Sequence, residues 1–90
     1  MAAEEAPSLI EYPSQFPIKV MGVNDPALEQ AVVDIALQFD AGYDRSTLQL
    51  RPSSGGKYLG LTLNITATSR EQLDALYSNL SSHPLVKVVL

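Results

Sequence analysis

The chain contains few residues of the kinds that carry out chemistry, and their spacing does not assemble a catalytic set. His83 is the single histidine and no cysteine is present, which excludes disulfides, thiolate metal sites and cysteine nucleophiles. A metal ion would need carboxylates alone, and these are scattered over the expected helix surfaces. Serine, aspartate and histidine all occur, but their placement does not suggest a triad. We therefore expect a protein that is not an enzyme and that has no metal site and no cofactor.

Two short segments carry groups that bind phosphate or carboxylate in other proteins. Residues 53–57 read Ser-Ser-Gly-Gly-Lys, but they lack the spacing of a phosphate-binding loop and lead into a strand, so we interpret them as a hairpin turn. Gly22, Asn24 and Asp25 lie before an expected helix N-terminus, where free N–H groups favour an anion. The Asp25 carboxylate would compete for the same groups. These three residues form the candidate site for a small ligand.

The length and composition predict a single domain that neither spans nor binds a membrane. Ninety residues provide a single hydrophobic core. The net charge of −4 opposes non-specific attraction to nucleic acid or anionic lipid. No apolar run approaches the roughly 20 residues that span a bilayer, and residues 1–6 do not resemble a secretion signal. We expect a cytoplasmic protein with a flexible leader over residues 1–13 and one domain over residues 14–90.

Apolar periodicity predicts six elements in the order β-α-β-β-α-β. Strands are expected over residues 15–21, 46–52, 57–68 and 85–90. The first helix should start at Asp25 and end at residues 40–42, where Gly42 can take the left-handed conformation. The second should start with a capping box of Ser69 and Gln72. Two β-α-β halves with right-handed crossovers predict a ferredoxin-like sandwich. Its four-stranded antiparallel sheet has the order fourth, first, third, second, with both helices on one face.

Two helices cover one face of such a sheet and leave the other face open. Alternation along the strands places three of the six basic residues on the open face and no carboxylate. It also turns Val86, Val88 and Leu90 toward the core, together with Leu48 and Leu50. We interpret the open face as a contact surface for a partner, the alternative being a solvated face whose lysines protect the sheet edge. The predicted contact residues are Lys19, Met21, Arg51, Tyr58, Lys87 and Val89.

Two functions known for this order of elements can be tested against the residues. Acylphosphatases place an arginine in the loop after the first strand, and residues 22–26 contain none. RNA-recognition modules stack bases on aromatic side chains of the two central strands. Tyr58 could serve, but the first strand offers Lys19 and Met21 instead. We therefore reject an acylphosphatase activity and keep nucleic-acid binding as a lesser alternative.

Several segments resemble the YbeD-like family of small bacterial proteins. They are residues 12–22, 51–58, 64–68, 77–80 and 86–90, together with Leu73, and the similarity spans residues 9–90. The resemblance implies a ferredoxin-like fold akin to ACT regulatory domains, with no established activity. Bacterial members tend to be encoded near the octanoyltransferase of lipoyl attachment, which implies an association with lipoate metabolism. ACT domains bind small ligands in the loop after the first strand, where Ala27 here replaces a common glycine.

We therefore predict a non-enzymatic regulatory or adaptor protein that binds a protein partner through the open sheet face. The link to lipoate metabolism is implied by the resemblance alone. The alternative is an ACT-like domain that senses an amino acid or small carboxylate near Gly22, Asn24 and Asp25. A homodimer formed through the exposed edge of the second strand is left open.

Overall fold

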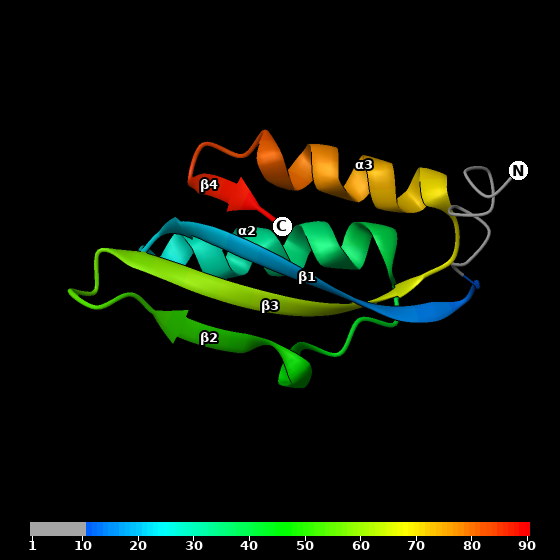
Figure 1. The fold of residues 1–90 in the computed structure, drawn as a ribbon, viewed down its shortest axis with the longest axis horizontal. Coiled ribbons are helices and arrows are strands. Elements are labelled where there is room, and N and C mark those ends of the chain that lie inside the picture. Colours follow the sequence, from blue (N-terminus) through cyan, green and yellow to red (C-terminus); the bar gives the residue numbers. More distant parts are fainter. Residues whose placement is uncertain (1–10) are drawn as a thin grey trace, which may run out of the picture.

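Two helices pack on one face of a four-stranded antiparallel sheet in the computed structural model, which describes residues 11–90 (Figure 1). The elements are β1 (Ser14–Val23), α2 (Pro26–Phe39), a 3-10 turn η1 (Arg45–Thr47), β2 (Gln49–Pro52), β3 (Tyr58–Ala67), α3 (Arg70–Ser81) and β4 (Val86–Val89). The sheet order β2-β3-β1-β4 confirms the predicted ferredoxin-like topology. Most of the predicted leader, residues 1–10, lies outside the described residues.

Helix α2 begins where the sequence predicted and ends differently. The Asp25 carboxylate accepts a hydrogen bond from the Ala27 N–H at 2.8 Å, and Pro26 occupies the first helical position. At the other end Asp40 leaves the helix in an extended conformation. The prediction of a left-handed Gly42 is wrong, because the positive φ values among the described residues belong to Gly55 and Gly56 in the hairpin turn.

Helix α3 begins with a cap that does more than the predicted capping box. The Ser69 hydroxyl accepts from the Gln72 N–H at 3.0 Å, as predicted. The Gln72 side chain, however, accepts from the Thr68 N–H at 2.7 Å rather than from that of Ser69. Its amide group also donates to the carbonyls of Phe39 at 2.7 Å and Thr66 at 3.1 Å. Gln72 thus ties together the ends of α2 and β3 and the start of α3.

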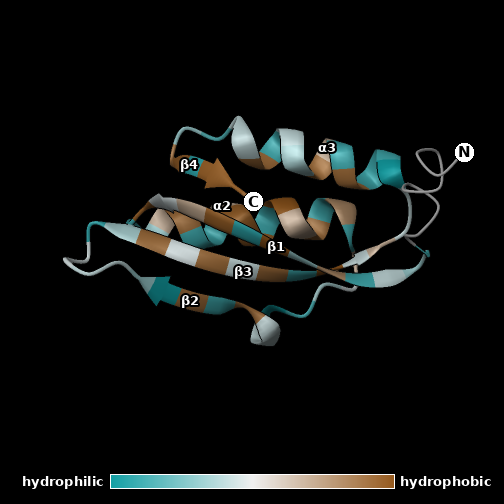
Figure 2. Ribbon diagram, in the orientation of Figure 1, coloured by the Kyte–Doolittle hydropathy of each residue, from teal (hydrophilic) through white to brown (hydrophobic). Residues whose placement is uncertain are grey.

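The core lies between the helices and one face of the sheet. On β3 every second residue is buried, which gives the alternating hydropathy seen along that strand in Figure 2. The central core residues are Ile18, Val20, Leu28, Val32, Leu61, Leu63, Ile65, Leu76 and Leu80, each at most 2% exposed. The alternation that predicted β3 is therefore confirmed. Among the described helices, none has the length and apolar character needed to cross a membrane.

Strand β1 extends further than predicted in both directions and tolerates a proline within it. The Lys19 N–H donates to the Leu90 carbonyl at 3.1 Å, so this edge of β1 faces β4. Amides two residues apart on a strand point to the same edge. Pro17 therefore lacks its N–H on the side that faces β4, beyond the last pairing with that strand, and no bond to β4 is lost.

A bulge in β4 reverses the direction predicted for the side chains at the end of that strand. Val89 pairs with Val20 and Val88 pairs with Met21, but Gly22 pairs with Val86, which leaves Lys87 as the extra residue. An extra residue reverses the alternation beyond it. Val86 faces the core as predicted, whereas Val88 lies on the open face and Val89 packs against the core. The predictions that Val89 faces outward and that Val88 and Leu90 face inward are wrong.

Strand β2 is shorter than predicted and lies at the sheet edge. Thr47 belongs to η1 rather than to a strand, because the Asp44 carboxylate caps that turn by accepting from the Ser46 N–H at 2.9 Å. Leu48 packs against the core as expected. Leu50 points to the helix side by its pairing with Leu61. Its strand lies to the side of the helices in Figure 1, so Leu50 is 46% exposed, contrary to its predicted core position.

Candidate functional site

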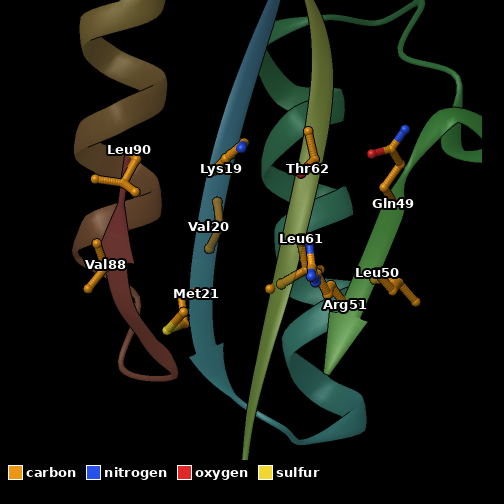
Figure 3. Close-up of a pocket in the computed structure, with 11 residues that line it drawn as sticks. Lys19, Val20, Met21, Gln49, Leu50, Arg51, Leu61, Thr62, Val88 and Leu90 are labelled. Atoms are coloured by element: carbon orange, nitrogen blue, oxygen red, sulfur yellow. The ribbon is translucent and has the colours of Figure 1, made fainter. Parts of the chain in front are cut away.

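The open face of the sheet carries a hollow of about 460 Å³, which we call the open-face hollow (Figure 3). All four strands contribute to it, and Figure 3 shows β4 on one side and β2 on the other, with the helices behind the sheet. Its lining residues are Lys19, Val20, Met21, Gln49, Leu50, Arg51, Gly60, Leu61, Thr62, Val88 and Leu90. The hollow therefore lies over the centre of the face that the helices leave uncovered.

Strand register builds the hollow from two rows that run across the sheet. The first row is Arg51, Gly60, Met21 and Val88, and the second is Gln49, Thr62, Lys19 and Leu90. Neighbouring strands are about 4.8 Å apart, so each row spans about 14 Å from β2 to β4. Gly60 carries no side chain in the middle of the first row. The missing side chain leaves the depression between Arg51 and Met21.

The hollow combines two cations with exposed apolar side chains. Met21 and Val88 are each 45% exposed and Leu90 is 74% exposed. Lys19 and Arg51 carry the charges, and no carboxylate side chain occurs among the described lining residues. Such a surface favours a ligand that is anionic and partly apolar.

The predicted contact residues divide into three groups. Lys19, Met21 and Arg51 line the open-face hollow. Tyr58 lies further along the same side of β3, where the Lys57 ammonium is 5.5 Å from the centre of its ring. Lys87 is exposed in the β4 bulge, and Val89 faces the opposite side of the sheet. The structure thus brings together three of the six residues.

Sequence reasoning missed two apolar residues of the hollow, Val88 and Leu90. The Leu90 N–H donates to the Lys19 carbonyl at 2.7 Å and extends the β4 pairing by one residue. Nothing in the local sequence signals the bulge that turns these side chains outward. The signal lies in the partner strand, because Gly22 sits opposite the bulge and glycine in a strand often marks such a site.

The candidate ligand loop after β1 is held together by its own contacts. The Asn24 side chain donates to the Gly56 carbonyl at 2.8 Å, and the Asn24 N–H donates to the Lys57 carbonyl at 3.1 Å. The Asp25 carboxylate caps α2. A Cβ on Gly22 would collide with the Leu85 carbonyl oxygen. These residues lie together, and their contacts connect the start of α2 with the hairpin turn and β4.

His83, which the sequence did not favour as a catalytic residue, has a structural contact. Its Nδ1 accepts a hydrogen bond from the Leu85 N–H at 3.1 Å, at the junction between α3 and β4. Within residues 11–90, no three histidine, aspartate or glutamate side chains gather closely enough to hold a metal ion.

At the other end of the open face, the connection between α2 and β2 brings carboxylates beside the sheet. Asp40 and Asp44 line a second, smaller hollow of about 180 Å³ together with Gln15, Asn64 and Thr66. The expectation of an open face without carboxylates is wrong at this end. The strands carry no carboxylate side chain at this end of the face, and both carboxylates come from the connection.

A family model described as "Protein of unknown function (DUF493)" matches residues 7–90. The chain belongs to the DUF493 family. Its relatives include a UPF0250 protein of Leptothrix cholodnii, 60% identical over 83 residues, and one of Bordetella pertussis, 58% identical over 83 residues. Each match covers 92% of this chain and 91% of the relative. These similarities confirm the resemblance to the small YbeD-like bacterial proteins.

The fold of this DUF493 protein is shared with a solved structure of distant sequence. The C-terminal domain of the MgtC protein from Mycobacterium tuberculosis matches with a TM-score of 0.62 at 18% identity. The match covers 90% of this chain and 88% of that one. At this identity the likeness concerns the fold alone.

Proposed function

We propose that this protein is a non-enzymatic adaptor whose open-face hollow binds a segment of a partner protein that carries carboxylates beside apolar side chains. The composition of the hollow supports this proposal more than any other observation. Lys19 lies beside the exposed side chains of Met21, Val88 and Leu90, and Arg51 lies across Gly60 from them. The carboxylates would approach the two cations, and the apolar side chains would fill the space above Gly60.

The shape of the hollow favours a peptide segment over a small metabolite. It extends across all four strands and is open to solvent along that length, whereas small-molecule sites usually enclose most of their ligand. Apolar contact at its centre would supply most of the binding energy, and the exposed cations would mainly set orientation and association rate.

The ACT-like alternative is supported by no comparable observation. The polar groups of Asn24 and Asp25 already have partners within the chain. An incoming anion would have to displace the Asp25 carboxylate from the start of α2. The link with lipoate metabolism concerns which partner is bound, and no feature of the open-face hollow selects one.

A pair of peptides tests the proposal directly. The acidic probe is acetyl-Glu-Ser-Leu-Ser-Glu-amide, in which both glutamates and the leucine lie on one side of an extended chain. Its matched control carries lysine at both glutamate positions. We expect the acidic peptide to shift the backbone amide NMR signals of Lys19, Met21, Gly60 and Thr62 in a saturable manner. We expect the control to leave them unchanged, because it places cations beside Lys19 and Arg51. Raising the salt from about 50 to about 300 mM should weaken binding, because the charges are exposed.

Charge-reversal variants supply the matched protein control. Lys19→Glu with Arg51→Glu should weaken binding of the acidic peptide by about tenfold or more. Arg70→Glu changes an exposed cation at the start of α3, where it pairs with Asp74 at 4.0 Å, and should leave binding unchanged. Equal binding of both peptides, or full binding by the doubly reversed variant, would overturn the proposal.

A further inference from the structure

The open-face hollow continues into an uncovered strip of the sheet that leads back toward the start of β1. Along this strip β1 presents Gln15, Pro17 and Lys19, all three exposed, and both helices lie on the other face (Figure 1). The Gln15 side-chain amide donates to the Thr66 hydroxyl at 3.0 Å, which joins β1 and β3 along the strip. Seven residues separate Tyr12 from Lys19, which corresponds to about 23 Å of extended chain. A segment that precedes β1 therefore reaches the open-face hollow if it returns along this strip.

The chain itself contains a segment with the composition that the open-face hollow favours. The sequence before β1, most of which the structure does not describe, carries Glu4, Glu5 and Glu11 and no lysine or arginine. Residues 6–10 read Ala-Pro-Ser-Leu-Ile and are uncharged. This segment thus combines carboxylates with apolar side chains, as the proposed partner segment does.

The order of charges in this segment matches the order of charges along the strip. A chain that reverses at Tyr12 and returns in an extended conformation brings Glu5 beside Lys19, because both lie seven residues from Tyr12. It brings residues 7–9 past the smaller hollow, whose lining includes two carboxylates. Residues 7–9 carry no charge. Opposite charges therefore meet at the open-face hollow, and like charges stay apart at the smaller one.

We propose that residues 3–10 of this chain fold back over the open face and occupy the open-face hollow, with their two glutamates beside Lys19 and Arg51. This inference rests on the proposed function, because it makes the segment an internal competitor of the partner. A segment tethered by a short connection acts at an effective concentration in the millimolar range. The partner then binds only those chains in which the hollow is free, and its apparent affinity falls by that fraction. The hollow thus admits partners whose acidic segments bind more tightly than the chain's own.

A spin label on the segment tests this contact in the full chain. The sequence contains no cysteine, so Ala3→Cys provides a single attachment point for a nitroxide. We expect the nitroxide to broaden the amide NMR signals of Gly60 and Thr62 much more than those of Gln30 and Asp34 on α2. Lys19→Glu with Arg51→Glu should remove most of that difference, because the glutamates lose their cations.

Two outcomes of the spin-label experiment would overturn the inference. One is equal broadening on the open face and on α2. The other is broadening of the open-face signals of an unlabelled chain by a separate spin-labelled chain to the same extent, because the contact would then form between two copies.

Neutral variants test the competition with the acidic probe peptide. Glu4→Gln with Glu5→Gln should bind this peptide about threefold more tightly than the parent, because the hollow is free in a larger fraction of the chains. Glu11→Gln with Glu71→Gln changes the net charge by the same amount away from the open-face hollow, and should leave peptide binding unchanged.

The results of this competition separate the inference from the proposed function. Equal peptide binding by the parent and by Glu4→Gln with Glu5→Gln would overturn the inference and leave the proposed function standing. Failure of the peptide to bind even the neutral variant would overturn the proposed function, while selective broadening of the Gly60 and Thr62 signals would still support the internal contact.

Discussion

The two faces of the sheet use the same strands under opposite constraints. On the helix side of β3, Leu61, Leu63 and Ile65 are at most 1% exposed, and each fills space against the helices. On the other side, Gly60 and Thr62 remain half-buried and Asn64 is exposed. Close packing restricts what the first side can hold, whereas the second side can carry charges and an empty space. The fold is therefore held by one face, and the other is free to take a binding role.

Two neighbouring residues of β3 give the strongest test of whether the helix side alone stabilises the fold. Leu63→Ala removes a fully buried side chain and should lower the free energy of unfolding by about 2–5 kcal/mol. Thr62→Val keeps the branched shape on the open face and should change it by no more than about 0.5 kcal/mol. Urea unfolding followed by circular dichroism measures both. Similar losses for the two variants would show that the open face is also needed for stability.

Two glycines, one on each face, sharpen the comparison further. A Cβ on Gly22 would meet the Leu85 carbonyl and the Leu28 side chain, so Gly22→Ala should destabilise the fold by about 1–3 kcal/mol. A Cβ on Gly60 would meet only the Arg51 carbonyl oxygen, at 3.4 Å. Gly60→Ala should leave the melting temperature nearly unchanged. Its methyl group would stand in the centre of the open-face hollow and should weaken binding of the acidic probe peptide.

A different result would contradict the prediction for each of the two glycine variants. An unchanged melting temperature for Gly22→Ala would mean that β4 can move away from β1 without cost. Unchanged peptide binding by Gly60→Ala would mean that the space above residue 60 is not used by the ligand.

The fold could be predicted from the sequence because its signals are local and repeated. The apolar alternation of β3 continues over ten residues, which suits a strand and no helix. Asp25 followed by Pro26 marks a helix start by the chemistry of its N–H groups. The order of elements then restricts the topology, because crossovers between parallel strands are right-handed.

The parts that were missed depend on contacts between distant segments. Residues 86–89 read Val-Lys-Val-Val, so apolar side chains occur at both alternating positions and the pattern cannot decide which ones face the core. The bulge that decides it is set by pairing with Met21 and Gly22. Asp40 joins Thr66 across 26 positions of the chain. No local pattern places that carboxylate beside the sheet, and the smaller hollow lined by Asp40 and Asp44 was missed for this reason.

The smallest expected effect concerns Tyr43, which lies where the two faces meet at the edge of β3. Burial raises the pKa of the Tyr43 hydroxyl, an effect that Thr47 and Arg45 partly offset. The folded state then holds this proton more tightly than the unfolded state, so the stabilisation is complete below the ordinary tyrosine pKa of about 10. It is lost as the pH rises through the higher folded value.

Tyr43→Phe removes both the buried hydroxyl and this alkaline loss. Because the contact of this hydroxyl with Thr47 falls outside good hydrogen-bond geometry, the variant should be as stable as the parent at pH 7, or up to about 1 kcal/mol more stable. Above about pH 10 its advantage should grow, because the parent must keep the Tyr43 phenol protonated in addition to that of Tyr77, whose pKa burial also raises. Tyr77→Phe leaves Tyr43 in place, so this variant should still show the loss of stability at alkaline pH that Tyr43 causes. Urea unfolding at neutral and alkaline pH measures these differences. A clear loss of stability in Tyr43→Phe at pH 7 would show that the contact of this hydroxyl with Thr47 is a hydrogen bond that stabilises the fold.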